Sequence, residues 1–351
     1  MLFWILLVVL VLVGWYFIAL RWQAEWYPDE IHFLPITGER HLTVHRFKPE
    51  GGVTRKHPVI LCHGLSASRF NLALPGRHSV ASVLNREGYD VWVIDLTGCG
   101  MSVPRSWLHP KRYDSCFDDY VDRDGPMVIE HVLAETGADQ VFWCGHSMGG
   151  MILYAMAQFD IAKKIAGGVA IASPAAFDDL GFFDAIAKRD YLLKFFNQID
   201  VGFFSRLTVP VVPYLPDLLH RPMLEAANMH LEDTRYVACN VLSTTPVRLL
   251  LQFSEWVKNR EVRSRTGYPY QTNLNRVTLP ILLLSAKSDL LASPRSVEYA
   301  YDHVSSEDKT YRYFALENEG KADYGHGDIV FGNDAPDEVF PVIRDWFNAR
   351  D

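Results

Sequence analysis

The chain has 351 residues, of which 49% are hydrophobic and 22% are charged, with 34 basic and 42 acidic residues. This composition excludes an intrinsically disordered chain, a collagen-like repeat and a small disulfide scaffold, and the length suits either one α/β domain with an insertion or two domains. The formal net charge is -8 and there is no polybasic run. We therefore expect no nucleic-acid partner, because an acidic protein gains no affinity from counterion release.

The N-terminal residues 2–20 are apolar and uncharged. A helix of about 19 residues at about 1.5 Å each spans about 28 Å, close to the hydrocarbon core of a bilayer. We expect residues 1–27 to be an uncleaved, single-pass membrane anchor that contacts the bilayer through residues 2–20. The alternative is a cleaved signal peptide. The run is long for one, no Lys or Arg precedes it, and no small-residue cleavage site follows.

Two features bear on the orientation of this anchor. Arg21 is the only basic residue beside the apolar run. The positive-inside rule then favours a cytosolic location for the part of the chain that follows the anchor. The cysteines are odd in number and lack paired spacing, which is typical of reduced thiols. They are Cys62, Cys99, Cys116, Cys144 and Cys239. Both features favour the cytosolic side only weakly.

Apolar runs and amphipathic stretches alternate along residues 28–351, which we expect to form one domain. The apolar runs predict strands and the stretches with helical periodicity predict helices. The predicted strands are residues 58–62, 89–95, 140–145, 165–172, 280–285 and 310–316, and the predicted helices are residues 79–87, 126–135, 148–159, 294–304 and 338–348. Strands separated by helices indicate an α/β fold with a mostly parallel sheet covered on both faces. Residues 41–47 alternate and predict an antiparallel edge strand.

The alternation stops at about residues 176–271, where helical patterns carry many aromatic residues. We expect an inserted helical lid here, because such insertions often cover a ligand site. The alternative is that the aromatic side chains form a small core of their own. They include Phe182, Phe183, Phe195, Phe196, Phe203, Phe204, Phe253 and Trp256.

Ser147 lies at the centre of a Gly-x-Ser-x-Gly pattern, between Gly145 and Gly149. A predicted strand precedes it and a predicted helix follows. This is the context of a nucleophile elbow, a tight turn whose small neighbours let the serine hydroxyl project outward. A serine hydroxyl becomes a good nucleophile only when a base accepts its proton and a carboxylate orients that base. Ser147 is therefore the candidate nucleophile.

The candidate base and acid lie further along the chain. His326 stands between two glycines, after the last predicted strand and before the last predicted helix. Asp289 follows a buried strand directly and so reaches the carboxyl edge of the sheet, where open α/β sheets hold their sites. Its alternative role is to cap the helix that begins near Pro294. Rival carboxylates that follow no apolar strand so directly are Asp302, Asp308, Asp323 and Asp328.

The order Ser, Asp, His and the elbow resemble the α/β-hydrolase superfamily, from about residue 33 to the C-terminus. The resemblance rests on His63-Gly64, residues 95–102, residues 145–149, Asp289 and His326, with residues 88–92 and 113–149 most similar to acid lipases and hydrolases of polyhydroxyalkanoate metabolism. It implies that Ser147 is the nucleophile, His326 the base and Asp289 the acid. It also implies an oxyanion hole formed by the backbone N–H groups of Leu65 and Met148, with His63 ordering the loop.

The sequence lacks the motifs of phosphate-binding loops, dinucleotide sites and zinc proteases, so we expect no metal and no organic cofactor. His41 and His45 share a strand face without a third ligand, and we expect both at the surface. The favoured function is a membrane-anchored serine hydrolase that cleaves small carboxylic esters with an apolar, lipid-like acyl chain. The alternatives are a thioesterase, an amidase or an acyltransferase using the same residues, or a non-catalytic interaction protein of the same fold.

Overall fold

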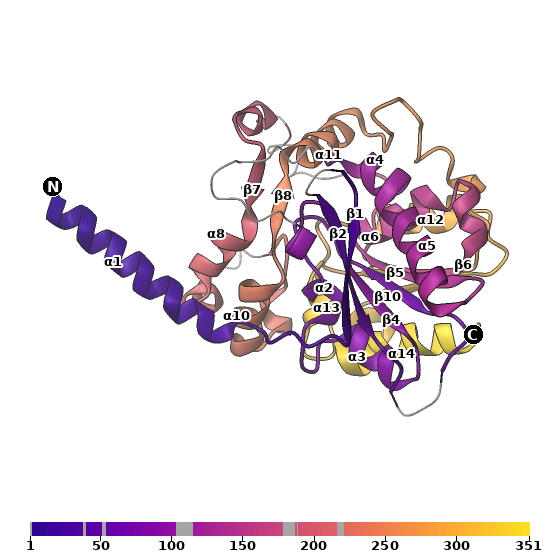
Figure 1. Ribbon diagram of the computed structural model, residues 1–351, viewed down its shortest axis with the longest axis horizontal. Helices are drawn as coiled ribbons and strands as arrows, with labels where there is room; N and C mark the ends of the chain where they lie inside the picture. Colours follow the sequence, from indigo (N-terminus) through magenta and orange to yellow (C-terminus); the bar gives the residue numbers. More distant parts are fainter. Residues whose placement is uncertain are drawn as a thin grey trace.

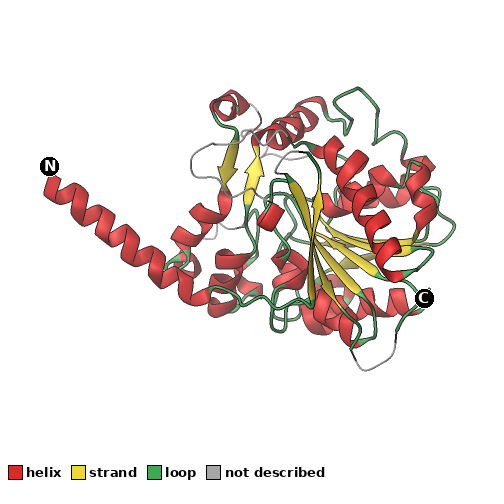
Figure 2. Cartoon of the chain, in the orientation of Figure 1, coloured by secondary structure: helices red, strands yellow, loops and turns green. Residues whose placement is uncertain are grey.

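The computed structural model describes residues 2–37, 40–50, 54–102, 115–177, 187, 189–215 and 221–351. Its centre is an eight-stranded sheet with the strand order β1-β2-β4-β3-β5-β6-β9-β10 (Figures 1 and 2). The strands from β4 to β10 in this order run parallel, whereas β2 runs antiparallel to β4, and β1 to β2. The strands are β1 (Glu30–Pro35), β2 (His41–Phe47), β3 (Val59–Cys62), β4 (Val91–Asp95), β5 (Val141–His146), β6 (Ile165–Ile171), β9 (Ile281–Ala286) and β10 (Lys309–Phe314). The expected mostly parallel sheet is confirmed.

The prediction that residues 41–47 form the edge strand of the sheet is wrong. β2 is antiparallel as predicted, but β1 pairs with its free side, with Glu30 opposite Arg46 and Pro35 opposite His41. β1 was not predicted because polar and partly exposed residues interrupt its short apolar pattern. Its pairing depends on the neighbouring strand rather than on its own hydrophobic periodicity.

Helices cover both faces of the sheet. Helices α3 (Val80–Arg86) and α14 (Ala335–Asn348) lie together on one face, whereas α5 (Gly125–Thr136), α6 (Met148–Met156) and α12 (Pro294–His303) lie on the other (Figure 1). Short helices complete this part of the chain: α2 (Phe70–Ala73), α4 (Phe117–Asp119), α13 (Asp328–Phe331), and the single turns η2 (Gly100–Ser102), η3 (Tyr120–Asp124), η4 (Asp160–Lys164), η8 (Leu274–Arg276) and η9 (Leu316–Asn318). The core between these layers is apolar and includes fully buried Trp92, Trp143 and Phe347.

Among the described residues between β6 and β9, the chain forms helices and one small two-stranded sheet ahead of η8. The elements are η5 (Asp190–Phe195), β7 (Gln198–Asp200), α8 (Val201–Thr208), η6 (Val212–Tyr214), η7 (Ala226–Asn228), α10 (Leu231–Asn240), β8 (Thr244–Pro246) and α11 (Val247–Asn259). β7 and β8 pair antiparallel. Strands of three residues are too short to show periodicity in a sequence, which explains why the helical prediction missed them.

The aromatic residues of this segment fall into two groups. Phe253 and Trp256 pack with Phe117 and Phe177, and Trp256 belongs to the main core of the domain, so these side chains do not form the separate small core of the alternative interpretation. By contrast, four phenylalanines are exposed, with Phe195 at 83%: Phe195, Phe196, Phe203 and Phe204. Phe182 and Phe183 lie outside the described residues.

Helix α1 (Leu2–Ala19) projects away from the body (Figures 1 and 2). Residues Phe3–Trp22 are apolar and long enough to cross a membrane, by length and composition, and most of their surface is free. Only the end of α1 that leads into η1 (Leu20–Trp22) contacts the body. There the indole N–H of Trp15 donates to the Leu207 carbonyl at 2.7 Å.

Candidate active site

Ser147 occupies the turn between β5 and α6 with φ of 54°, in the left-handed region that non-glycine residues rarely adopt. The two glycines of the motif are required because neighbouring backbone atoms lie too close to leave room for a side chain. A Cβ on Gly145 would lie 2.2 Å from the backbone of Gly149, and a Cβ on Gly149 would lie 2.2 Å from the Cys62 carbonyl oxygen. The turn is therefore tight, and Ser147 borders a pocket at its tip.

His326 and Asp289 lie beside Ser147 although they are far away in sequence. His326 Nε2 is 2.9 Å from Ser147 Oγ, and His326 Nδ1 is 2.8 Å from Asp289 Oδ2. Both the imidazole and the carboxylate are buried. The other carboxylate oxygen, Oδ1, accepts the backbone N–H groups of Leu291 and Ala292, each at 2.7 Å. With the Nδ1–H of His326 donating to Asp289, the Nε2 lone pair faces the serine hydroxyl.

The rival carboxylates occupy other places. Asp302 is exposed on α12, and Asp308 pairs with Arg350. Asp323 accepts the Leu316 backbone N–H. Asp328 is buried but accepts from the Asn228 amide and from the backbone of Glu225 and Gly325. None of these four carboxylates hydrogen-bonds to the His326 ring, whereas Asp289 does.

The loop after β3 lies against the serine. A Cβ on Gly64 would meet the Ser147 Cβ at 3.0 Å, so the Gly64 backbone passes close to the nucleophile. Leu65 lines the same pocket, and Met148 is the first residue of α6. Neither the Leu65 nor the Met148 backbone N–H donates to another described residue. Both donors are free for a ligand.

His63 is held by two hydrogen bonds. The Leu96 backbone N–H donates to its Nε2 at 3.1 Å, and its Nδ1–H donates to the Gly64 carbonyl at 2.8 Å. Burial lowers the pKa of His63 and favours this neutral form. A ring with both nitrogens engaged orders the loop and has no free lone pair for proton transfer, as the sequence led us to expect.

Two residues near the site were not singled out from the sequence. The Asn71 Oδ1 accepts the Gly64 N–H at 2.8 Å and lies 3.1 Å from His146 Nδ1. The Nε2–H of His146 donates to the His326 carbonyl at 2.9 Å. Burial, reinforced by the nearby His326, lowers the pKa of His146 to about 3. His146 was visible as the second residue of the Gly-x-Ser-x-Gly pattern, but Asn71 carries no sequence signal because only the fold brings it here.

The pocket beside Ser147 is mostly apolar and has a volume of about 170 Å³. The loop after β3, the turn that holds Ser147 and the loop that holds His326 form one side of the pocket. Residues from α8, η6 and α10 form the other side, and among the described lining residues no side chain is a carboxylate, lysine or arginine. The apolar side chains on this second side include Val212, Val237, Ala238, Val241 and Leu242.

The histidines of β2 differ from expectation. His45 is fully buried: the Trp26 indole N–H donates to its Nδ1 at 3.1 Å, and its Nε2 lies 3.3 Å from Asp95 Oδ2. The prediction of a surface position for His45 is wrong, because Trp26, from the N-terminal segment, covers this face of β2. His41 is only partly buried, and its Nε2 lies 3.0 Å from the Met101 carbonyl oxygen.

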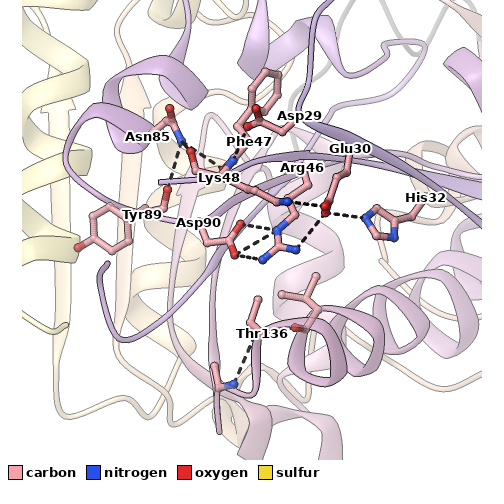
Figure 3. Close-up of polar contacts among 12 residues, drawn as sticks. Asp29, Glu30, His32, Arg46, Phe47, Lys48, Asn85, Tyr89, Asp90 and Thr136 are labelled. Atoms are coloured by element: carbon pink, nitrogen blue, oxygen red, sulfur yellow. Dashed lines mark hydrogen bonds and ion pairs between the residues drawn. The ribbon is translucent and has the colours of Figure 1, made fainter. Parts of the chain in front are cut away.

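One group among the described residues has the spacing of a metal site: His32, His131 and Glu135. His32 faces Glu30, which also pairs with Arg46, as Figure 3 shows. The His131 Nε2 lies 3.1 Å from the His32 Nδ1. A hydrogen bond from His131 to His32, and one from His32 to Glu30, account for these contacts without an ion. The group lies on the edge strand β1 and on α5, and Ser147 follows β5 in the middle of the sheet.

Comparison with known proteins places this geometry in a family. A family model described as serine aminopeptidase, S33, matches residues 54–316. The chain is 28% identical to a gastric triacylglycerol lipase of Bos taurus over 90% of this chain and 87% of that protein. It is 31% identical to Lipase 1 of Drosophila melanogaster over 88% of this chain and 74% of that protein.

Solved structures show the same fold. A soluble variant of monoglyceride lipase from Saccharomyces cerevisiae, in complex with a substrate analog, superposes with a TM-score of 0.64 at 16% identity, over 93% of this chain and 97% of that one. A monoacylglycerol lipase of Paleococcus ferrophilus gives 0.56 at 19% identity, over 88% and 99%. The chain belongs to the S33-like serine aminopeptidase family of α/β-hydrolases, in the branch of carboxylic-ester hydrolases that contains lipases and esterases.

Proposed function

We propose that this protein is a membrane-anchored serine hydrolase that cleaves carboxylic esters with apolar, lipid-like acyl chains. The observation that carries the proposal is the hydrogen-bonded series from Ser147 through His326 to Asp289, with separations of 2.9 and 2.8 Å. The serine oxygen attacks the ester carbonyl while His326 Nε2 accepts its proton. His326 then protonates the leaving alcohol, and Asp289 stabilises the imidazolium.

The second half of the reaction releases the acyl group. Water donates a proton to His326 Nε2 as its oxygen attacks the acyl-enzyme, and the proton then returns to the Ser147 oxygen as the acid leaves. In both halves the developing oxyanion accepts the backbone N–H groups of Leu65 and Met148. Each such donor is typically worth about 2.7 to 4 kcal/mol in the transition state. The sequence of steps requires neither a metal nor an organic cofactor.

The apolar acyl preference rests on the pocket lining. Aliphatic side chains such as Val237 and Val241 gain contact with an acyl chain and lose water. An aminopeptidase needs an anionic group to bind the substrate's ammonium, and no described lining residue has one. This favours esters over peptides with a free N-terminus as substrates, although the family model is described as a serine aminopeptidase. The lipase relatives point the same way.

The membrane assignment rests on α1. Most of its surface is exposed, as for Leu10 at 68%, and an exposed apolar helix of this length is stable in hydrocarbon rather than in water. We propose an anchor over residues 1–27 and a catalytic domain over residues 28–351, with the lid at about residues 176–271. A cytosolic catalytic domain fits Arg21 and the five free, buried cysteines.

The test is fluorophosphonate labelling together with p-nitrophenyl esters from acetate to palmitate, on full-length protein in detergent. We expect wild type to be labelled and to cleave the longer esters. Ser147→Ala loses the label and about four to six orders of magnitude in kcat. Ser305→Ala, an exposed serine, serves as the control and keeps both. A wild-type protein that is neither labelled nor active on any ester contradicts the proposal and favours the interaction protein.

A further inference from the structure

The end of the membrane helix is hydrogen-bonded to the last residue of α10. The buried Asn240 side chain donates through Nδ2 to the carbonyl oxygens of Trp22 at 2.7 Å and Tyr236 at 2.8 Å. Its Oδ1 accepts the backbone N–H of Ala24 at 2.8 Å. The amide thus satisfies one carbonyl and one N–H of the segment that leaves α1. A buried backbone group without a partner costs free energy, so these bonds hold the segment in place.

The residues directly after Asn240 hold the loop that contains Leu65. The Val241 carbonyl accepts the backbone N–H of Ser68 at 3.0 Å and its hydroxyl at 3.2 Å. The Ser243 N–H donates to the Ser66 carbonyl at 2.8 Å, and the Thr245 hydroxyl donates to the Ser66 hydroxyl at 2.8 Å. Residues 241–245 therefore connect α10 to both residues that flank Ala67.

Ser66 needs such support because its φ is 59°. A non-glycine residue in the left-handed region costs free energy, and it persists only when surrounding contacts hold it there. Ser66 follows Leu65 directly in the same turn, so its conformation constrains the position of Leu65 and of the Leu65 backbone N–H. A relaxation of Ser66 would therefore shift that donor.

The segment 240–244 borders two cavities, although Asn240, Val241 and Ser243 are buried. The apolar pocket of about 170 Å³ is lined by Val241 and Leu242, and a second cavity of about 920 Å³ among the described residues is lined by Asn240 and Leu242 through Thr244. Leu242 separates the two. A cavity removes packing contacts from the side that faces it, so hydrogen bonds contribute to the position of this segment.

We propose that Asn240 is a positioning residue, which clamps the end of the membrane helix to residues 241–245 and thereby aims the Leu65 N–H at the reacting carbonyl oxygen. The proposal rests on the proposed function for the identity of the oxyanion donor. It makes the anchor part of the catalytic geometry as well as a membrane tether. Loss of the amide should then lower kcat more than it raises KM, because Asn240 itself does not line the apolar pocket.

The experiment compares Asn240→Ala with a matched variant, Asn348→Ala, in full-length detergent-solubilised protein. Asn348 is also a hydrogen-bonded asparagine, but it bonds to Tyr89 on the far face, beside α3. For a soluble short-chain p-nitrophenyl ester we expect Asn240→Ala to lower kcat by about 10-fold or more, with KM nearly unchanged. Complete loss of one oxyanion donor typically lowers kcat by about 10² to 10³, and a displaced donor should cost less. Amide hydrogen exchange over residues 64–68 should become faster in this variant only.

Two further variants keep the test decisive if Asn240→Ala does not fold. Asn240→Asp retains the acceptor for Ala24 but loses both donors, and we expect an intermediate kcat. Thr245→Val removes only the hydrogen bond to Ser66 at nearly constant volume and should also lower kcat. Folded variants with wild-type kcat and wild-type exchange over residues 64–68 overturn the proposal. An inactive, unlabelled wild type instead contradicts the proposed function, and the exchange measurement still tests the clamp.

Discussion

The carboxyl edge of the sheet and the α1–α8 region border the same pocket, but different forces hold them. At the sheet edge the Asp289 and His326 side chains are fully partnered: Asp289 accepts three hydrogen bonds and His326 makes two through its ring. In the α1–α8 region, Phe203 and Phe204 are exposed, and α8 packs along the end of α1. Under the proposed function, the reaction would depend on the hydrogen-bonded groups of the sheet edge, and access for an apolar substrate would depend on the exposed aromatic surface of the α1–α8 region.

The largest expected effect concerns the sheet edge. Asp289→Asn should lower kcat by about three to four orders of magnitude, because an amide that donates to His326 Nδ1 favours the tautomer with the proton on the wrong nitrogen. The measurement is kcat for a short-chain ester, which does not depend on the membrane. Asp302→Asn, at an exposed rival carboxylate, is the control and should match wild type. If the two variants had equal activity, Asp289 would not be the acid.

The second prediction concerns the α1–α8 surface. The double variant Phe203→Ser, Phe204→Ser should reduce hydrolysis of a long-chain ester presented in vesicles by at least about 10-fold, because even one phenylalanine that enters lipid contributes about 1.5 to 3 kcal/mol and about 1.4 kcal/mol corresponds to a factor of ten. Hydrolysis of a soluble acetate ester should remain unchanged. Phe159→Ser, at an exposed aromatic that contacts Tyr268 away from α1, is the matched control. Equal losses on both substrates would mean that the surface acts through folding rather than through lipid.

The third prediction concerns the pH dependence of stability at the sheet edge. Burial lowers the pKa of His146 to about 3 in the folded protein, whereas a free histidine has a pKa near 6.5. Between these values the unfolded chain binds more protons, so the free energy of unfolding rises with pH and falls as the solution is acidified. His146→Gln should remove the contribution of this histidine to the slope of the unfolding free energy against pH. That contribution is at most one proton, or about 1.4 kcal/mol per pH unit.

Urea unfolding at several pH values between about 4 and 7 measures this slope. His303→Gln, at an exposed histidine on α12, is the control and should keep the wild-type slope. A His146→Gln protein with the same slope as wild type would show that His146 is charged in the fold, with both ring nitrogens donating.

The sequence predicted the parallel strands and the main helices to within a few residues, because each carries its own periodicity. For example, the predicted strand 140–145 and helix 148–159 correspond to β5 and α6, and the predicted helix 79–87 corresponds to α3 with its N-cap Ser79. The three candidate residues do meet in space. The edge strand β1, the pair β7–β8 and the burial of His45 were missed, since each depends on a partner that is distant in the chain.

What the sequence determined alone is local and periodic: the apolar helix at the N-terminus, the α/β alternation, the elbow around Ser147, and the order of Ser147, Asp289 and His326. Only the tertiary structure shows which polar groups form hydrogen bonds around these residues. Asn71 and Asn240 became visible only through hydrogen bonds to residues that are mostly remote in the sequence, and the hydrogen-bond partner of His146 became visible in the same way. The physical reason is that a buried amide or imidazole takes its role from its partners, and the folded chain brings those partners together.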